Sequence, residues 1–203
     1  MRKHLAVFSI ILCLSIFFAF PVCATGPDVD VYVTPKGTLI DVSIETSSEV
    51  GALQGAISYD GDAIEYDTAA ANSNILSYNA AGNSFMNSNG ITRVALVGDP
   101  SSGTVNKWAS VTYYAEENTP AEFTLNGFKA FAVDGSDAGA SFSVVVLGDA
   151  NGDKLVNVKD YVKLKLVIAQ SAGYTVNPKN LNVNKMGGTD GYDMTALRNI
   201  MDF

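Results

Sequence analysis

Apolar side chains recur at every second position through most of this 203-residue chain. From Val29 to Leu147, short runs such as "DVDVYV" and "LIDVSI" alternate apolar and polar residues, and clusters of Gly, Asn, Asp, Ser and Pro separate them. A period of two is typical of strands that bury one face, whereas a helix repeats every 3.6 residues. The pattern predicts eight or nine strands in an antiparallel β-sandwich or jelly roll. The range 68–89 is expected to hold a long loop.

The pattern changes at Gly148. The sequence "YVKLKLVIAQ" has helical spacing, with lysines interleaved, and "MTALRNIM" near the C-terminus is a shorter version. The apolar positions of the first predicted helix are Tyr161, Leu164 and Ile168 on one side, with Val162 and Leu166 beside them. No Pro-, Thr- or Ser-rich linker precedes this part, so it is expected to abut the predicted sandwich.

The first 24 residues have the composition of a secretory signal peptide. A basic start, "MRK", precedes the apolar run "LAVFSIILCLSIFFAF" and the small-residue sequence "VCA". The run is short for a membrane-spanning helix, so export and cleavage after Ala24 are predicted. Cleavage would remove Cys13, Cys23 and His4, which are the only cysteines and the only histidine. The remaining chain then lacks Cys and His nucleophilic chemistry and the usual zinc ligands.

The charge is unevenly divided between two predicted modules. Residues 25–147 contain four Lys or Arg and fifteen Asp or Glu, a net charge of −11, whereas residues 148–203 have a net charge of +1. An acidic body of this kind argues against nucleic acid as a partner. The predicted organisation is a signal peptide (1–24), a mainly β sandwich (25–147) and a small α-helical module (148–203).

The segment "GDANGDKLVNVKD" at residues 148–160 presents oxygen-bearing side chains at regular intervals. Twelve-residue loops with oxygen ligands at positions 1, 3, 5, 7, 9 and 12 bind Ca²⁺, and position 7 contributes a backbone carbonyl. The predicted ligands are Asp149, Asn151, Asp153, the carbonyl of Leu155, Asn157 and Asp160. Position 6 is usually Gly but is Lys154 here, which costs about 1 kcal/mol if its φ is positive. The alternative is an Asp- and Asn-rich turn that caps a helix without a metal.

A weaker copy of this loop follows 33 residues later. The sequence "NVNKMGGTDGYD" offers ligands at positions 1, 3, 9 and 12, which are Asn182, Asn184, Asp190 and Asp193. Only two of these are carboxylates, so the second site is predicted to be empty or of low affinity. Leu164 and Leu197 follow the two loops at the same offset, which indicates an internal duplication. A structural copy that binds no metal is an equal alternative.

These two loop–helix units resemble a dockerin, the duplicated calcium-loop module of cellulosome-type assemblies, over residues 148–203. The matching sequences are "GDANGDKLVNVKDYVKLKLVIAQ" and "LNVNKMGGTDGYDMTALRNIM". The resemblance implies calcium-dependent folding and docking onto a cohesin module of another scaffold protein. It implies partner contacts at Val158, Lys159, Lys165 and Leu166. The usual Ser/Thr pair is absent at 158–159, and the second repeat has Gly191 and Tyr192 there, so one dominant docking orientation is expected.

The preceding part resembles a cohesin over residues 27–147. The matching sequences are "TPKGTLIDVSIETSSEVGALQGAISYDGDAIEY", "NGITRVALVG", "WASVTYYAEENTPAEFTLNGFKAFAVDG" and "ASFSVVV". The resemblance implies a nine-stranded jelly roll that accepts dockerin-bearing enzymes. The acidic excess would then complement lysine-rich partner helices.

Two other classes of function compete with this interpretation. Carbohydrate-binding modules share the jelly roll and use exposed aromatic side chains to stack on sugars. In "WASVTYY", strict alternation places Trp108 and Tyr114 on one face, where they would be part of such a platform. The alternative is that one of these aromatics is core and the other a surface residue. An enzyme would need a carboxylate pair for glycoside hydrolysis, but the acids carry no motif and the sandwich is small for a substrate cleft.

The sequence therefore predicts a secreted, non-catalytic adaptor of a polysaccharide-degrading, cellulosome-type complex, with Ca²⁺ as its cofactor. Its predicted partners are a cohesin at the C-terminal module and dockerin-bearing enzymes at the sandwich. It is expected outside the cell, or at the cell surface through a partner. The alternative is a dockerin-borne carbohydrate-binding module.

Overall fold

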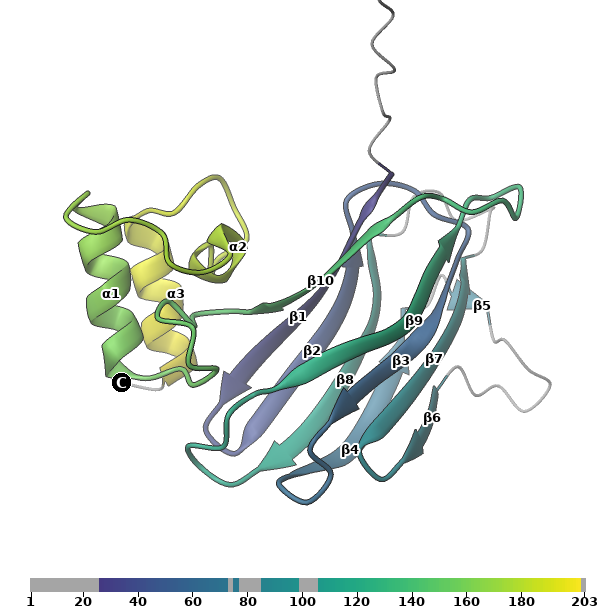
Figure 1. Ribbon diagram of the computed structural model, residues 1–203, viewed down its shortest axis with the longest axis horizontal. Coiled ribbons are helices and arrows are strands. Elements are labelled where there is room, and N and C mark those ends of the chain that lie inside the picture. The colour runs from purple at the N-terminus through teal and green to yellow at the C-terminus, as the bar shows by residue number, and fades with distance from the viewer. Residues whose placement is uncertain (1–25, 73–74, 77–84, 99–105, 202–203) are drawn as a thin grey trace, which may run out of the picture.

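The computed structural model describes residues 26–72, 75–76, 85–98 and 106–201. These residues form a two-sheet β-sandwich followed by three helices (Figure 1). The predicted signal peptide lies outside the described residues. Among the residues that are described, no helix is both long enough and apolar enough to cross a membrane. The described residues of the sandwich lie within 26–147, and those of the helical module are 148–201.

The first sheet, sheet A, has the strand order β10–β1–β2–β8–β4. Its strands are β1 (Asp28–Lys36), β2 (Leu39–Thr46), β4 (Ile64–Ala71), β8 (Lys107–Ala115) and β10 (Ser141–Val146). In β2, Ile40, Val42 and Ile44 are buried and the residues between them are partly exposed. The alternation seen in the sequence is thus the inward and outward alternation of the strand.

The second sheet, sheet B, has the strand order β5–β7–β3–β9, with β6 also paired to β7. Its strands are β3 (Ala52–Tyr59), β5 (Ile75–Leu76), β6 (Phe85–Ser88), β7 (Ile91–Gly98) and β9 (Phe123–Phe131). β5 pairs with the end of β7 and β6 with its start, so together they form one interrupted edge strand. The predicted 68–89 loop therefore contains the end of β4, all of β5 and β6, and further residues outside the described ranges.

One strand pair departs from the antiparallel prediction. β1 pairs with β10 in parallel, with Asp28 opposite Ser141 and Val33 opposite Val146. The other pairs are antiparallel. A parallel pair requires a long connection, and β1 and β10 stand at opposite ends of the sandwich sequence. Alternation alone could not reveal this pairing.

Tyr113 on β8 is fully buried at the centre of the core between the two sheets. Its ring lies 4.9 Å from Tyr59, 5.2 Å from Phe123 and 6.0 Å from Tyr66, centroid to centroid. Its hydroxyl donates a hydrogen bond of 3.0 Å to Thr92 on β7, which joins sheet A to sheet B. Burial raises the pKa of the Tyr113 hydroxyl, so it stays neutral and remains a donor.

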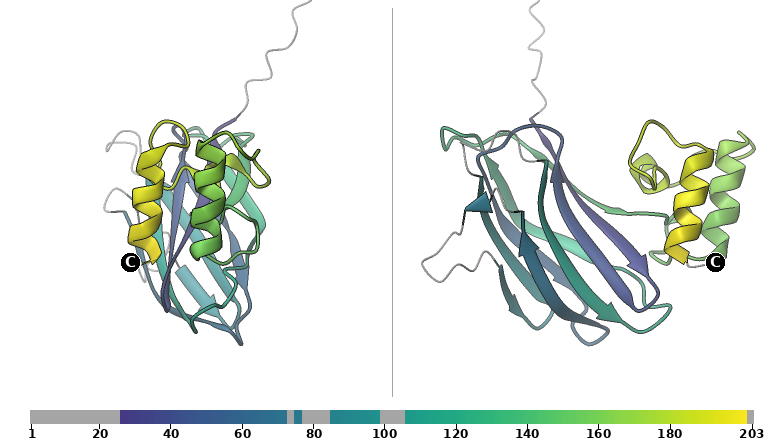
Figure 2. Two further views of the ribbon diagram at one scale, coloured as in Figure 1. Left: turned by 90° about the vertical axis from the view of Figure 1, so that its left-hand side faces the viewer. Right: turned by 180° about the vertical axis from the view of Figure 1, so that it is seen from behind.

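The helices are α1 (Val158–Ile168), α2 (Pro178–Leu181) and α3 (Gly191–Met201). α1 and α3 lie side by side (Figure 2). Their own core is formed by Ala150, Leu164, Val167, Leu181, Val183 and Leu197. Val162 and Leu166, which the sequence places beside the apolar side of the first helix, are 52% and 42% exposed. They face away because α1 packs on one side only, against α3 and the loops.

The helical module lies against sheet A (Figure 1): α3 contacts β1, and α2 contacts β10. The connection is short, since Leu147 still donates its N–H to Val33 and the next residue, Gly148, donates to Asn180 on α2. Val156 packs against both hydrophobic cores. The helical module and the sandwich are therefore in direct contact, as the absence of a linker indicated.

Removing the buried hydroxyl of Tyr113 tests the link between the sheets. We expect Tyr113→Phe to lower the free energy of unfolding by about 1–2 kcal/mol, because Thr92 loses a buried donor. Urea denaturation followed by circular dichroism measures this. The same change at the neighbouring Tyr114, which is 46% exposed, should alter stability by less than about 0.5 kcal/mol. Equal losses from the two variants would contradict the assignment.

Candidate functional site

Three carboxylates converge in the first loop. Asp149 and Asp160 are fully buried and Asp153 is exposed, yet one oxygen from each lies within 4.8 Å of the other two. Calcium–oxygen bonds are 2.3–2.6 Å long, so two oxygens on opposite sides of one ion lie roughly 4.6–5.2 Å apart. The spacing of the three carboxylates therefore fits a single Ca²⁺.

Asp160 is held in place by the backbone of its own loop. One of its oxygens accepts hydrogen bonds from the N–H groups of Ala150 (3.0 Å) and Asn151 (3.2 Å). The other accepts from the N–H of Asn157 at 2.9 Å, while the Asn157 side chain caps α1. This reciprocal capping box ties the last ligand position to the start of the helix. The alternative interpretation from the sequence, a turn that caps a helix, describes the same residues without explaining why three carboxylates meet.

The other predicted ligands belong to the same loop, where backbone N–H groups bond to their side chains. Asp149 accepts from the N–H of Gly152 at 2.6 Å, and Asn151 accepts from the N–H of Asp153 at 2.8 Å. Asp153 in turn accepts from the N–H of Leu155 at 3.0 Å. Because each oxygen retains a second lone pair, these bonds orient the side chains without preventing coordination.

Position 6 of the loop has the strain that the sequence predicted. Lys154 has a φ of +65°, in the left-handed region that favours glycine, at a cost of about 1 kcal/mol. Its carbonyl accepts a hydrogen bond of 2.9 Å from the N–H of Ala121, in the segment between β8 and β9. The sandwich thus helps to hold the loop in this conformation.

The carboxyl of Asp160 shows the electrostatic cost of the arrangement. Burial raises its pKa, the three backbone hydrogen bonds oppose that rise, and the neighbouring charge of Asp149 adds to it. The backbone donors therefore compensate the buried charge only in part. A bound divalent cation would favour the ionised form of all three carboxylates.

Asn180 on α2 supports the first ligand position and was not predicted from the sequence. Only 4% of this residue is exposed, and its side-chain amide donates to the carbonyl of Asp149 at 3.3 Å. The backbone carbonyl of Asn180 accepts a hydrogen bond from the N–H of Gly148 at 2.8 Å. Asn180 therefore holds the backbone on both sides of the Gly148–Asp149 peptide bond. A four-residue helix has no periodic pattern that could have revealed it.

The second loop repeats the hydrogen bonds of the first. Asp193 accepts from the N–H groups of Asn184 (3.0 Å) and Asp190 (2.8 Å), as Asp160 does in the first loop. Asn182, at position 1, instead donates its amide to the carbonyl of Gly187 at 3.1 Å. Within the described ranges, the only cluster of three carboxylates is the one in the first loop. Of the four predicted ligands of the second loop, Asn184, Asp190 and Asp193 are joined by hydrogen bonds, and with two carboxylates the loop does not fit a calcium site of the same strength.

The predicted partner-contact residues lie on the surface of α1. Val158 and Leu166 are 58% and 42% exposed, and Val162 between them completes an apolar stripe at intervals of four residues. Lys159 and Lys165 are exposed beside it. The equivalent surface of the second repeat differs, because Tyr192 takes the place of Lys159.

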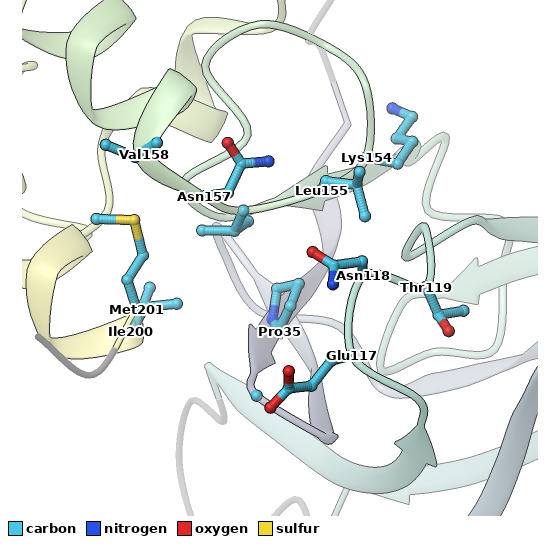
Figure 3. Close-up of a pocket in the computed structure, with 12 residues that line it drawn as sticks. Pro35, Glu117, Asn118, Thr119, Lys154, Leu155, Asn157, Val158, Ile200 and Met201 are labelled. Carbon is cyan, nitrogen blue, oxygen red and sulfur yellow. The ribbon is translucent and has the colours of Figure 1, made fainter.

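The apolar stripe begins at the junction with the sandwich. A cavity of about 440 Å³ lies there, lined by Val158 and Met201 from the helices and by Pro35 and Asn118 from the sandwich. Figure 3 shows these side chains around the opening. A protein that covers Val158 would therefore also approach the sandwich.

The aromatic platform of the carbohydrate-binding alternative is not formed, since one of its two aromatics is in the core and the other is at the surface. Trp108 is fully buried, and its indole N–H donates to Thr46 at 3.2 Å, whereas Tyr114 is 46% exposed. A β-bulge explains the difference: Ala109 pairs with Ile44 but Lys107 pairs with the next residue, Glu45, which leaves Trp108 as the extra residue. The bulge breaks the alternation and turns Trp108 inward. Tyr114 is then the only largely exposed aromatic side chain among the described residues of the sandwich.

The two sheets differ sharply in charge. The strands of sheet A contain six Asp or Glu, whereas those of sheet B contain none and carry Arg93 and Lys129. Gln54, Arg93 and Lys129 are exposed on the outer face of sheet B. Arg93 lies opposite Ala56 and Lys129 opposite Gln54, on either side of the central strand β3. The outer face of sheet B thus carries two cations among polar and apolar side chains, including Met86, which is 63% exposed and lies opposite Arg93.

No protein-family model matches this chain, and no curated protein matches it. Among solved structures it is similar to the sixth cohesin of scaffoldin B from Acetivibrio cellulolyticus, solved with the Cel5 dockerin (16% identity, TM-score 0.45, 60% of this chain and 99% of that one). It is also similar to a cohesin from Clostridium acetobutylicum (17%, 0.44, 62% and 94%). A third is a non-cellulosomal cohesin from the hyperthermophilic archaeon Archaeoglobus fulgidus (18%, 0.41, 59% and 91%). At these identities and TM-scores the likeness by itself assigns no function.

Replacing Asn180 tests whether α2 supports the first loop. We expect Asn180→Ala to weaken Ca²⁺ binding by roughly 10- to 100-fold, the usual effect of losing a partner of a metal ligand. Isothermal titration calorimetry measures the affinity. Asn199→Ala, at an exposed position on α3, is the matched control and should leave the affinity unchanged. An Asn180 variant that binds as tightly as the control would contradict the supporting role.

Proposed function

We propose that the chain is a secreted, non-catalytic adaptor that joins two proteins, with a calcium-dependent, dockerin-like plug at its C-terminus and a cohesin-like receiving sandwich. The observation that carries the proposal is the convergence of Asp149, Asp153 and Asp160 beside the start of α1. A cation there would fix the loop and, through the capping box at Asn157, the first turn of the helix. Calcium would supply rigidity, and the protein surfaces would supply recognition.

The plug would present the apolar stripe Val158–Val162–Leu166. Exposed apolar side chains at this spacing, flanked by Lys159 and Lys165, favour a partner surface with an apolar centre and carboxylates around it. A cohesin module of another scaffold protein is the proposed occupant. The second repeat offers a different surface, which supports one dominant orientation.

The sandwich would receive its partner on sheet B, because the helical module lies against sheet A. The partner helix would carry carboxylates opposite Arg93 and Lys129. This revises the expectation that the acidic excess steers lysine-rich helices, since the acidic strands belong to the other sheet. It also disfavours docking of this chain's own lysine-flanked α1 onto a second copy.

The assembly served by such an adaptor would be a cellulosome-type complex that degrades polysaccharides. The alternative, a dockerin-borne carbohydrate-binding module, loses support because Trp108 is buried, which leaves Tyr114 as the one largely exposed aromatic side chain in the part of the sandwich that the structure describes. A single exposed tyrosine gives little stacking area for a sugar chain.

The proposal is tested by binding of the full chain to purified cohesin modules, dockerin modules and soluble polysaccharides. Surface plasmon resonance with calcium should detect a cohesin partner and a dockerin partner, and EDTA should abolish the cohesin contact. Binding to polysaccharide alone would contradict the adaptor role. Glycan hydrolysis that is lost when one carboxylate is neutralised would contradict the non-catalytic role.

The two loops should contribute unequally to the plug. We expect Asp149→Ala to weaken Ca²⁺ binding by about 100-fold or more and to abolish cohesin binding, because a direct ligand is lost. Asp193→Ala should have a smaller effect on both, because the second loop lacks the third carboxylate. Calorimetry and plasmon resonance on both variants provide the comparison. Equal losses would show that the ranking of the loops is wrong.

Reversing the two cations of sheet B tests the receiving face. We expect Arg93→Glu combined with Lys129→Glu to weaken dockerin binding by about tenfold or more. The introduced carboxylates would then face the carboxylates of the partner helix. Lys107→Glu, an exposed change on sheet A, is the matched control and should leave binding intact. If the control weakens binding and the double variant does not, the partner occupies the other sheet.

A further inference from the structure

The second loop keeps the shape of the first without the charge that would hold a metal. Its position 5 is Met186, which is 69% exposed, and its position 1 is the neutral Asn182. The resemblance to dockerins implies two calcium loops, and the donor set of this one does not fit that expectation. Without an ion, the loop relies on its internal hydrogen bonds and on contacts outside it.

Lys185, at position 4 of the second loop, has an unfavourable backbone conformation. Its φ is +58°, and the equivalent residue of the first loop is Gly152, with a φ of +89°. Residues other than glycine rarely adopt this region of positive φ. A compensating interaction of the lysine side chain is therefore expected.

That interaction is with the outer face of sheet A. The Lys185 ammonium lies 2.6 Å from a carboxylate oxygen of Glu45 and 3.5 Å from the hydroxyl of Ser43. It also lies 3.8 Å from the ring centroid of Tyr32, a cation–π distance. Tyr32 on β1 and Ser43 on β2 are directly opposite each other, and the Glu45 side chain is only 25% exposed. These three side chains form the lysine pocket.

A second lysine anchors the chain just before the loop. Lys179 on α2 lies 2.7 Å and 2.9 Å from the two carboxylate oxygens of Asp30, and 3.3 Å from Asp28. Burial is the largest single influence and opposes its charge, but the hydrogen bonds and charges of Asp30 and Asp28 together outweigh it, so the pKa of Lys179 is raised. The chain therefore enters the second loop from a segment that is itself fixed to β1.

We propose that the second loop is a metal-free copy, and that the lysine pocket of sheet A takes the place of its calcium ion. The ammonium of Lys185, reaching from the loop to Glu45 and Tyr32, restrains the loop from outside. The second repeat thus serves as an intramolecular anchor that orients the plug on the sandwich. This inference concerns the chain alone and holds whether or not it docks on a partner.

Hydrogen exchange of the full chain, followed by mass spectrometry, tests the anchor. Lys185→Gly preserves the backbone conformation and removes the ammonium. We expect it to speed exchange at the N–H groups of Asn184, Met186 and Asp190 by about fivefold or more, with or without calcium. Exchange at Ala150 and Asn151 in the first loop should not change.

Two further variants separate the pocket from a general loss of stability. Lys36→Ala removes an ion pair with Asp41 on the same two strands and should leave the second loop protected. The charge swap Lys185→Glu with Glu45→Lys should restore part of the protection that Lys185→Glu alone removes. Rescue is expected only if these two side chains act as a pair.

Native mass spectrometry of the unmodified chain counts the ions. One bound Ca²⁺ per chain, together with EDTA exposing the first loop but not the second, supports the proposal. Two bound ions, equal exposure of both loops by EDTA, or unchanged exchange in Lys185→Gly would overturn it.

Discussion

The structure of the helical module depends on how the mutual repulsion of three carboxylates in its first loop is offset. Asp149, Asp153 and Asp160 lie within 4.8 Å of one another, and two of them are fully buried, so water cannot screen their charges as it does at an open surface. Loop N–H groups offset this only in part, as the raised pKa of Asp160 indicates. The same residue closes the capping box that begins α1. The ionic state of the loop and the first turn of the helix are therefore linked, and the proposed docking stripe starts at that turn.

Each loop is tied to the sandwich at a residue with positive φ, but by different groups. In the first loop the carbonyl of Lys154 accepts from Ala121, which leaves the carboxylates available for an ion. In the second, the side chain of Lys185 reaches Glu45, and fewer carboxylates remain. The repeats share a hydrogen-bond pattern while one is suited to a cation and the other to an acidic surface. Because both contacts fix the same module, its orientation on the sandwich is better defined than a linker would allow.

The sequence predicted what depends on local periodicity and spacing, and missed what depends on contacts between distant segments. Alternation located the strands, and the ligand spacing located the loop whose carboxylates converge. Trp108 was misplaced because a single inserted residue on β8 reverses the alternation, which no pattern on that strand records. The spacing alone could not tell that Val162 and Leu166 are exposed, because an apolar residue on a helix gives the same pattern whether it is buried or left for a partner. Only the resemblance to dockerins had placed a partner contact at Leu166. Asn180 was missed because it contacts Gly148 and Asp149 only after folding brings these distant segments together.

The net charge of the sandwich did not predict which partner it would attract, because that depends on which sheet carries the charge. The −11 of the predicted sandwich is concentrated in sheet A and the loops, and the lysines of the helical module neutralise part of it within the same chain. The two proposed docking surfaces, the lysine-flanked stripe of α1 and the outer face of sheet B, both carry exposed cations. Two surfaces of like charge do not complement each other, so electrostatics disfavour docking of the α1 stripe of one copy onto sheet B of another. On the proposed role, the chain would instead link two different partners, each of which supplies the carboxylates.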